Sequence, residues 1–173
     1  VIYSPGPAVT EGRLLYQDAG DATLMTIDFD NLEPVHELVT AATLTVNSTN
    51  AANAINYTQG SSATRGLVSV DAFETIEFEN KVDLVLNGLA GDDVIDLNNP
   101  NTPTSLTKIT VNGGDATATD KVVVNGTATT NSIVYTPTGR DSGTITGAQP
   151  VIVDVATTEL LVINGQGGDD SVT

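Results

Sequence analysis

Two short stretches of the sequence combine glycines with paired aspartates. The chain reads NGLAGDD at 87–93 and NGQGGDD at 164–170, each directly after an apolar run. Carboxylates are the hard oxygen ligands that calcium prefers, and glycines allow the backbone to curl around an ion. The candidate calcium ligands in these stretches are Asp92, Asp93, Asp169 and Asp170.

A third stretch, NGGDATATD at 112–120, adds Asp115 and Asp120 as weaker candidate ligands. The alternative for all three stretches is a Gly-Asp turn, in which the aspartate side chain accepts hydrogen bonds from nearby backbone amides. Residue types and spacing suit a calcium site and a turn alike, so both interpretations stay open at this point.

The segments that must position these turns recur along the chain. Four strand-like pieces end in asparagine, at spacings of 40, 38 and 39 residues: TLTVN at 43–47, DLVLN at 83–87, KVVVN at 121–125 and LLVIN at 160–164. We expect Asn47, Asn87, Asn125 and Asn164 to stack in one hydrogen-bonded ladder. A further asparagine-ended piece, ITVNGG at 109–114, indicates that the third period is organised differently.

The local pattern is that of strands. β-branched residues dominate, apolar positions alternate, and Gly, Asn, Asp, Thr and Pro fill the gaps between them. The segment 35–44 could form a short helix, but its place in the repeat favours a strand.

A fixed period of short strands predicts an all-β fold. We expect a parallel β-helix, or β-solenoid, with coils of roughly 20 residues stacked around a Val/Ile/Leu interior. Residues 25–173 would form the repeat region and residues 1–24 a leading segment or cap. The alternative is a tandem pair of antiparallel β-sandwiches.

The last residues, GGDDSVT at 167–173, stop in the middle of an expected strand. An open solenoid end exposes unpaired backbone groups and normally carries a cap. We therefore expect the repeats to continue beyond this chain, or another copy to cover its end.

Composition restricts the partners. The chain has 22 acidic and 6 basic residues, for a net charge of −16. Nucleic acids and anionic membrane surfaces need clustered Lys and Arg, so neither is an expected partner, whereas cations are. The same charge also serves solubility alone. Cysteine is absent, which excludes disulfides and thiolate metal sites. No apolar stretch approaches the length of a membrane span, and any export signal would lie upstream.

Residues suited to catalysis are few. Polysaccharide-cleaving β-helices need carboxylate pairs, often beside a basic residue. Here His36 is the only histidine, and Arg13, Arg65 and Arg140 are the only arginines. None lies in a recognisable motif, so we expect a protein that is not an enzyme.

Each of the remaining polar and aromatic residues has a structural interpretation. We expect His36 to be solvated or to cap a turn, and Arg65 and Arg140 to share a role at the loop edge. The solvated strand face would carry Glu74, Glu77 and Glu79, and the outer-layer packing would include Tyr57 and Tyr135.

The Gly-Asp stretches resemble the hemolysin-type (RTX) calcium-binding nonapeptides, whose form is G-G-x-G-x-D-x-U-x. NGLAGDDVIDL and NGQGGDDSV match the first and later glycines, the aspartate and the apolar position, with Leu89 and Gln166 in place of the second glycine. This resemblance implies bound Ca²⁺.

The longer pattern, from DFDNLEPV at 28–35 through DVIDL at 93–97, resembles the degenerate repeats of very large secreted or surface proteins of bacteria. That resemblance implies a structural, non-catalytic module outside the cell: a stalk, an adhesin, or a building block of a fibre or surface layer. Its partners would be further repeats, other copies of itself, or cell-surface glycans. The alternatives are a carbohydrate-active β-helix enzyme and a glycan-binding adhesin domain.

Overall fold

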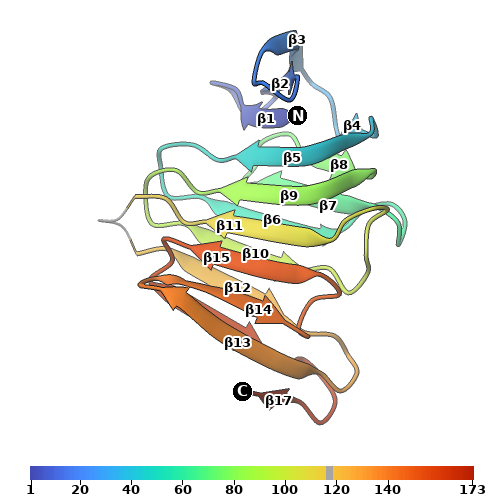
Figure 1. Ribbon diagram of the computed structural model, residues 1–173. Helices are drawn as coiled ribbons and strands as arrows, with labels where there is room; N and C mark the ends of the chain where they lie inside the picture. Colours follow the sequence, from blue (N-terminus) through green and yellow to red (C-terminus); the bar gives the residue numbers. More distant parts are fainter. Residues whose placement is uncertain (116–118) are drawn as a thin grey trace.

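The computed structural model describes residues 1–115 and 119–173, and within these ranges every regular element is a β-strand (Figure 1). The strands are β1 (Ile2–Pro5), β2 (Glu11–Gln17), β3 (Thr23–Asp30), β4 (Val35–Glu37), β5 (Ala41–Asn47), β6 (Ala54–Gln59), β7 (Gly66–Val70), β8 (Ile76–Phe78), β9 (Lys81–Asn87), β10 (Val94–Asn98), β11 (Lys108–Asn112), β12 (Lys121–Asn125), β13 (Ser132–Gly139), β14 (Ser142–Thr146), β15 (Ile152–Ala156), β16 (Leu160–Asn164) and β17 (Ser171–Val172).

The strands form two sheets. The long sheet has ten strands in the order β17-β13-β14-β15-β11-β9-β5-β1-β2-β3. The short sheet has seven strands in the order β16-β12-β10-β6-β7-β8-β4.

Parallel pairing runs through the middle of both sheets. In the long sheet β1, β5, β9, β11 and β15 pair in parallel, and in the short sheet β6, β10, β12 and β16 do the same. The chain passes from a strand of one sheet to a strand of the other and then advances, which stacks about four turns of a solenoid (Figure 1). The predicted all-β solenoid is confirmed.

The coils are longer than the roughly 20 residues expected for a simple solenoid repeat. Hydrogen-bonded asparagines on neighbouring coils are 40 residues apart for Asn47 and Asn87, and 25 apart for Asn87 and Asn112. The longer coil contains the antiparallel excursion β6–β7–β8, whereas the chain from β10 to β11 makes no such excursion. Coil length therefore varies with the hairpins inserted between the two parallel stacks.

The interior lies between the two stacks. Leu84 and Leu86 on β9 face Ile95 and Leu97 on β10, and all four side chains are fully buried. Burial of such a side chain stabilises the fold by roughly 1.5–3 kcal/mol. Because alternate residues of each strand point inward, the Val/Ile/Leu pattern of the sequence produces one continuous core.

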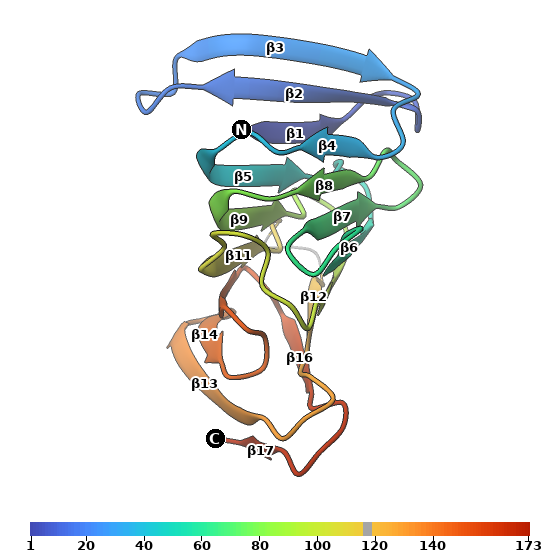
Figure 2. The same ribbon diagram turned by 90° about the vertical axis from the view of Figure 1, so that its right-hand side faces the viewer.

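Antiparallel strands extend the long sheet at the N-terminal end. β1 pairs in parallel with β5 and antiparallel with β2, and β2 pairs antiparallel with β3. Figure 2 shows β2 and β3 beyond the short sheet, with β3 outermost. Leu24, at the predicted boundary of the leading segment, lies inside β3. The segment 35–44 contributes to β4 and β5, as the repeat pattern predicted.

Candidate functional site

The first Gly-Asp turn places a buried carboxylate against the preceding coil. Asp93 Oδ1 accepts a hydrogen bond from the backbone N–H of Asn53 at 2.8 Å, and the Asp93 side chain is inaccessible to solvent. Asp93 Oδ2 approaches Gly88 so closely that a Cβ there would lie 2.5 Å from it. Asp93 therefore links two coils, and glycine is needed at position 88.

The same contact continues into the next coil. The backbone N–H of Asp93 donates to Asp120 Oδ1 at 2.9 Å, and the backbone N–H of Asp120 donates to Glu159 Oε2 at 2.8 Å. Asp92, which is exposed, accepts the backbone N–H of Thr119 at 2.9 Å. Acidic side chains thus form an acid column along one edge of the rod, defined here as Asp93, Asp120 and Glu159.

The second Gly-Asp turn repeats this geometry near the C-terminus. Asp170 Oδ1 accepts the backbone N–H of Asn131 at 2.8 Å, and a Cβ on Gly165 would lie 2.4 Å from Asp170 Oδ2. Asp169 and Asp170 are both exposed, unlike Asp93. Asp115 is exposed in the loop after β11, and the sequence-predicted stretch 112–120 includes residues 116–118, which lie outside the described ranges.

Burial changes the acidity of the acid column. Desolvation raises the pKa of Asp93 to about 6, against the hydrogen bond from Asn53, and the nearby Asp120 adds to the rise. Desolvation also raises the pKa of Asp120, with Glu159 acting in the same direction. Asp93 Oδ2 and Asp120 Oδ2 are buried without a hydrogen-bond partner among the described residues. These two carboxyl groups therefore hold protons more tightly than ordinary aspartates.

The aspartates accept backbone amides of neighbouring coils, rather than the nearby amides of the turn alternative. Within residues 1–115 and 119–173, no three Asp, Glu or His side chains gather as a group that could hold a metal ion. The structure brings Asp93 and Asp120 into one column, whereas Asp169 and Asp170 lie in the turn between β16 and β17. Calcium binding by these aspartates stays a prediction from the sequence.

Asparagine ladders form, but not as one stack. Asn87 Nδ2 donates to Asn47 Oδ1 at 2.9 Å, and Asn112 Nδ2 donates to Asn87 Oδ1 at 2.8 Å, all in the long sheet. In the short sheet, Asn164 Nδ2 donates to Asn125 Oδ1 at 3.1 Å. The predicted single ladder of four is wrong, because β11 takes the next place in the long sheet and β12 then falls in the short one.

A cluster that the sequence did not reveal lies on the short sheet. Glu77 is buried, and its carboxylate contacts Arg65 Nη1 at 2.8 Å, Ser61 Oγ at 2.9 Å and His36 Nδ1 at 3.3 Å. Burial alone would raise the pKa of Glu77, but the hydrogen bonds from Ser61 and Arg65 outweigh it and lower the pKa. Arg65 also contacts Glu79. This ion-pair network joins β4, β8 and the loop between β6 and β7.

Several side-chain predictions for this region are corrected. Glu74 and Glu77 are not on a solvated face: both are buried. Desolvation raises the pKa of Glu74. Tyr57 is an interior residue whose ring stacks on Phe78 at 6.3 Å between centroids, rather than an outer-layer residue. Arg140 is exposed and pairs only with its neighbour Asp141 within the described structure, so it does not share the role of Arg65.

A second buried ion pair lies where β4 meets β9. Lys81 Nζ is 3.2 Å from Glu37 Oε1 and donates to the carbonyls of Glu79, at 3.0 Å, and Val39. Tyr16 Oη donates to the other carboxylate oxygen of Glu37. Desolvation lowers the pKa of Lys81, against the effect of Glu37. The charged atoms of Glu37 and Lys81 are hydrogen-bonded within the protein. Because Glu37 contacts both Tyr16 of β2 and Lys81 of β9, the pair connects the β2–β3 hairpin to the first coil.

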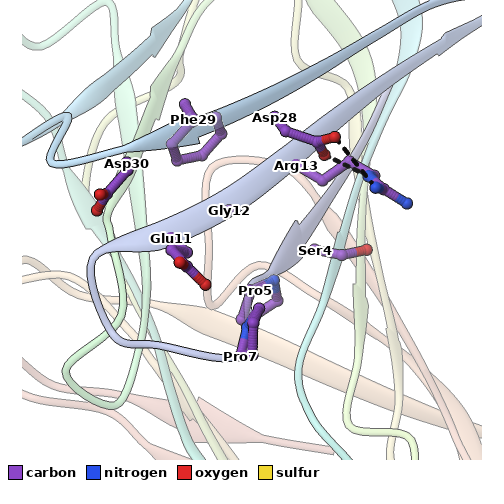
Figure 3. Close-up of a pocket in the computed structure, with 10 residues that line it drawn as sticks. Ser4, Pro5, Pro7, Glu11, Gly12, Arg13, Asp28, Phe29 and Asp30 are labelled. Carbon is purple, nitrogen blue, oxygen red and sulfur yellow. Dashed lines mark hydrogen bonds and ion pairs between the residues drawn. The ribbon is translucent and has the colours of Figure 1, made fainter.

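An open cavity of about 640 Å³ lies where β1, β2 and β3 meet the turn between β1 and β2. Figure 3 shows Glu11, Asp28 and Asp30 around it, with Phe29 at one side and Arg13 paired to Asp28. Arg13 Nε donates to Asp28 Oδ1 at 2.6 Å. The cavity thus combines an aromatic ring, carboxylates and a guanidinium on an exposed surface.

The C-terminal end has a second, more apolar hollow lined by Tyr135, Leu161, Ile163, Val172 and Thr173. Leu161 and Ile163 are in register with Val122 and Val124, which are fully buried in the coil before. The end coil therefore exposes part of the apolar interior.

Comparison with family models, curated proteins and solved structures found no match for this chain. No helix of the described residues could span a membrane.

Proposed function

We propose that this chain is a structural, non-catalytic module of an extracellular or cell-surface assembly, in which a short β-solenoid rod serves as a spacer or building block. The observation that carries the proposal is the use of the charged side chains. Two buried acids hold coils together: Asp93 through the backbone N–H of Asn53, and Glu37 through Lys81.

The outer surface supports the same role. The net charge of −16 keeps such a rod soluble and apart from anionic polymers. The residues closest to a reactive constellation are Glu77, Arg65 and His36, and each of their contacts fixes the position of strands.

Immunoelectron microscopy of the source cells tests the proposal. Antibodies raised against the purified chain should label extended structures at the cell surface or in the surrounding medium. Labelling confined to the cell interior would overturn the extracellular role. Hydrolysis of a polysaccharide by the purified chain would overturn the non-catalytic role.

The cavity beside β3 supports a second candidate function, glycan binding. An aromatic ring offers a face for the C–H groups of a sugar ring, while Glu11 and Asp30 could accept hydrogen bonds from its hydroxyls. A glycan array probed with the labelled chain tests it. Specific signals that Asp30→Ala abolishes and Asp141→Ala leaves unchanged would support glycan binding, and an array without signals would reject it.

A further inference from the structure

The strand β3 is the longest strand at a sheet edge. It has eight residues, and its side opposite β2 has no strand partner within the described ranges. The other edge strands are shorter: β4 has three residues, β16 has five and β17 has two. Figure 2 shows β3 outermost at the N-terminal end, where no other element covers it. Long exposed edges of this kind are templates for pairing with another strand.

The hydrogen bonding of the hairpin determines which backbone groups are free. The N–H of Asn31 donates to the carbonyl of Thr10 at 2.8 Å. In an antiparallel ladder the residues that bond a given neighbour alternate. From Met25 to Phe29 the odd-numbered residues therefore face β2 with their backbone groups, and Thr26, Asp28 and Asp30 direct theirs to the open edge; at Leu24 the register with β2 shifts.

The side chains of β3 are also exposed to an unusual degree for apolar residues. Leu24 is 68% exposed, Met25 55% and Ile27 39%. Met25 and Ile27 are opposite Tyr16 and Leu14 of β2, and share with Phe29 the face that turns toward the core. A partner strand would thus find free backbone groups at the edge and an apolar row on one face.

We propose that β3 pairs antiparallel with β3 of a second copy of this chain, about a twofold axis through Ile27. This inference deepens the proposed structural role, on which it rests, by naming the partner. Ile27 then faces its own counterpart, and Met25 faces Phe29 of the other copy. The ten-stranded sheets of two rods join into one continuous sheet, and the contact is closed, because both copies use the same surface.

The charges on β3 favour this arrangement over a parallel one. A parallel pairing of the same two edges would set even-numbered residues of one copy opposite odd-numbered residues of the other, so Asp28 and Asp30 would lie beside the apolar row of the second copy. The antiparallel pairing sets Asp28 against Thr26 and Asp30 against Leu24. The carboxylate of Asp28 is also paired with Arg13 at 2.6 Å within its own copy.

The register follows from the same alternation. Free backbone groups lie on even-numbered residues, so even residues must face even residues. An axis through Ile27 pairs all three apolar residues of the inner face with one another. An axis through Thr26 would instead set Phe29 against Thr23. In the favoured register, Ile27 forms a non-hydrogen-bonded pair with its counterpart, the pair type with the closer side chains.

Sedimentation equilibrium of the purified chain over a concentration series tests the pairing. A monomer–dimer equilibrium is expected, strengthened by salt, since each copy carries a net charge of −16. Ile27→Asp should raise the dimer dissociation constant at least about 100-fold, because it sets two carboxylates against each other in place of an apolar pair. Leu160→Asp, at the exposed edge strand β16, is the matched control and should leave the constant unchanged.

Cysteine cross-linking tests the register, since the natural chain has no cysteine. Ile27→Cys should form a disulfide-linked dimer under mild oxidation, faster than Thr26→Cys or Leu160→Cys. A dimer cross-linked faster through Thr26→Cys would overturn the register. A wild-type chain that stays monomeric at all concentrations and salts, or a dimer unaffected by Ile27→Asp, would overturn the pairing. Neither result alters the surface labelling that tests the structural role.

Discussion

The carboxylate of Asp93 accepts the backbone N–H of Asn53 from the neighbouring coil, while the N–H of Asp93 itself donates to Asp120. Each acid therefore completes the hydrogen bonding of the turn before it in the stack. The Gly-Asp turns work as connectors between coils, and this role determines what substitutions there should do.

Two substitutions of Asp93 distinguish the effect of its hydrogen bond from the effect of its charge. Asp93→Ala leaves the buried N–H of Asn53 without an acceptor, so we expect a loss of about 1–3 kcal/mol in the free energy of unfolding. Asp93→Asn keeps an acceptor oxygen and should cost less. Asn131, six residues after Asn125 as Asp93 is after Asn87, shows that an amide side chain fits at this position of the turn, where it accepts the N–H of Thr127. Urea unfolding measures both, and equal losses in the two variants would contradict this role.

The acid column should make stability depend on pH. The folded-state pKa of Asp93 is about 6, above the ordinary value of 3.8, so the folded chain binds this proton more tightly than the unfolded chain. The stabilisation is fully present below the ordinary pKa and is lost as pH rises through 6. We expect the contribution of Asp93 to stability to be larger at pH 5 than at pH 7.5.

Thermal unfolding of wild type and Asp93→Asn between pH 5 and 8 isolates this contribution. The difference between the two proteins should grow with pH in favour of the variant. Asp170→Asn makes the same substitution at the exposed equivalent position and is measured alongside. A wild-type-minus-variant difference that is constant across this range would contradict the raised pKa.

Gly88 should tolerate no side chain. A Cβ at this position would lie 2.1 Å from the carbonyl oxygen of Gly113 and 2.5 Å from Asp93 Oδ2. Because the first of these is backbone of the next coil, Gly88→Ala must separate two coils, and we expect about 1–3 kcal/mol of destabilisation or more. Gly20→Ala, where the nearest atom is 3.5 Å away, is the matched control. Urea midpoints that shift equally in both variants would refute this account.

The buried pair of Lys81 and Glu37 should be sensitive to the loss of one partner. Glu37→Gln leaves the Lys81 ammonium buried without its counter-charge, and we expect a loss of about 3–5 kcal/mol. Asp141→Asn removes the partner of the exposed Arg140 and should have little effect. Denaturant unfolding measures the free energy of unfolding of both variants. A Glu37→Gln variant as stable as the wild type would show that the pair contributes nothing to stability.

Calcium binding is decided by titration. Calcium bound at these turns would raise the unfolding temperature above that in chelator, whereas aspartates that act only through the hydrogen bonds of Asp93 and Asp170 would leave it unchanged. Isothermal titration calorimetry with calcium, repeated on Asp93→Ala and Asp170→Ala, provides the direct measurement. Binding heat in the wild type that disappears in either variant would favour the calcium interpretation over the turn.

The asparagine ladders show why the sequence predicted the repeated strands but did not predict which of the two sheets each strand joins. Asn87, Asn112 and Asn125 each end a strand of the same pattern. Their spacing does not tell which sheet each strand joins. The sequence shows the additional piece that ends at Asn112, but only the folded chain shows that it joins the long sheet and that β12 and Asn125 therefore fall in the short one.

The sequence by itself predicted an all-β solenoid, because the alternation of apolar residues and the recurring period can be recognised in the linear order of residues. It also located the Gly-Asp turns. The tertiary structure alone decided that Glu77 and Glu74 are buried, that Arg65 meets His36 across a shared carboxylate, and that β3 has an open edge. Burial and strand pairing depend on which coils, distant in sequence, lie against each other. The alternation of apolar residues along a strand does not indicate which coils are neighbours.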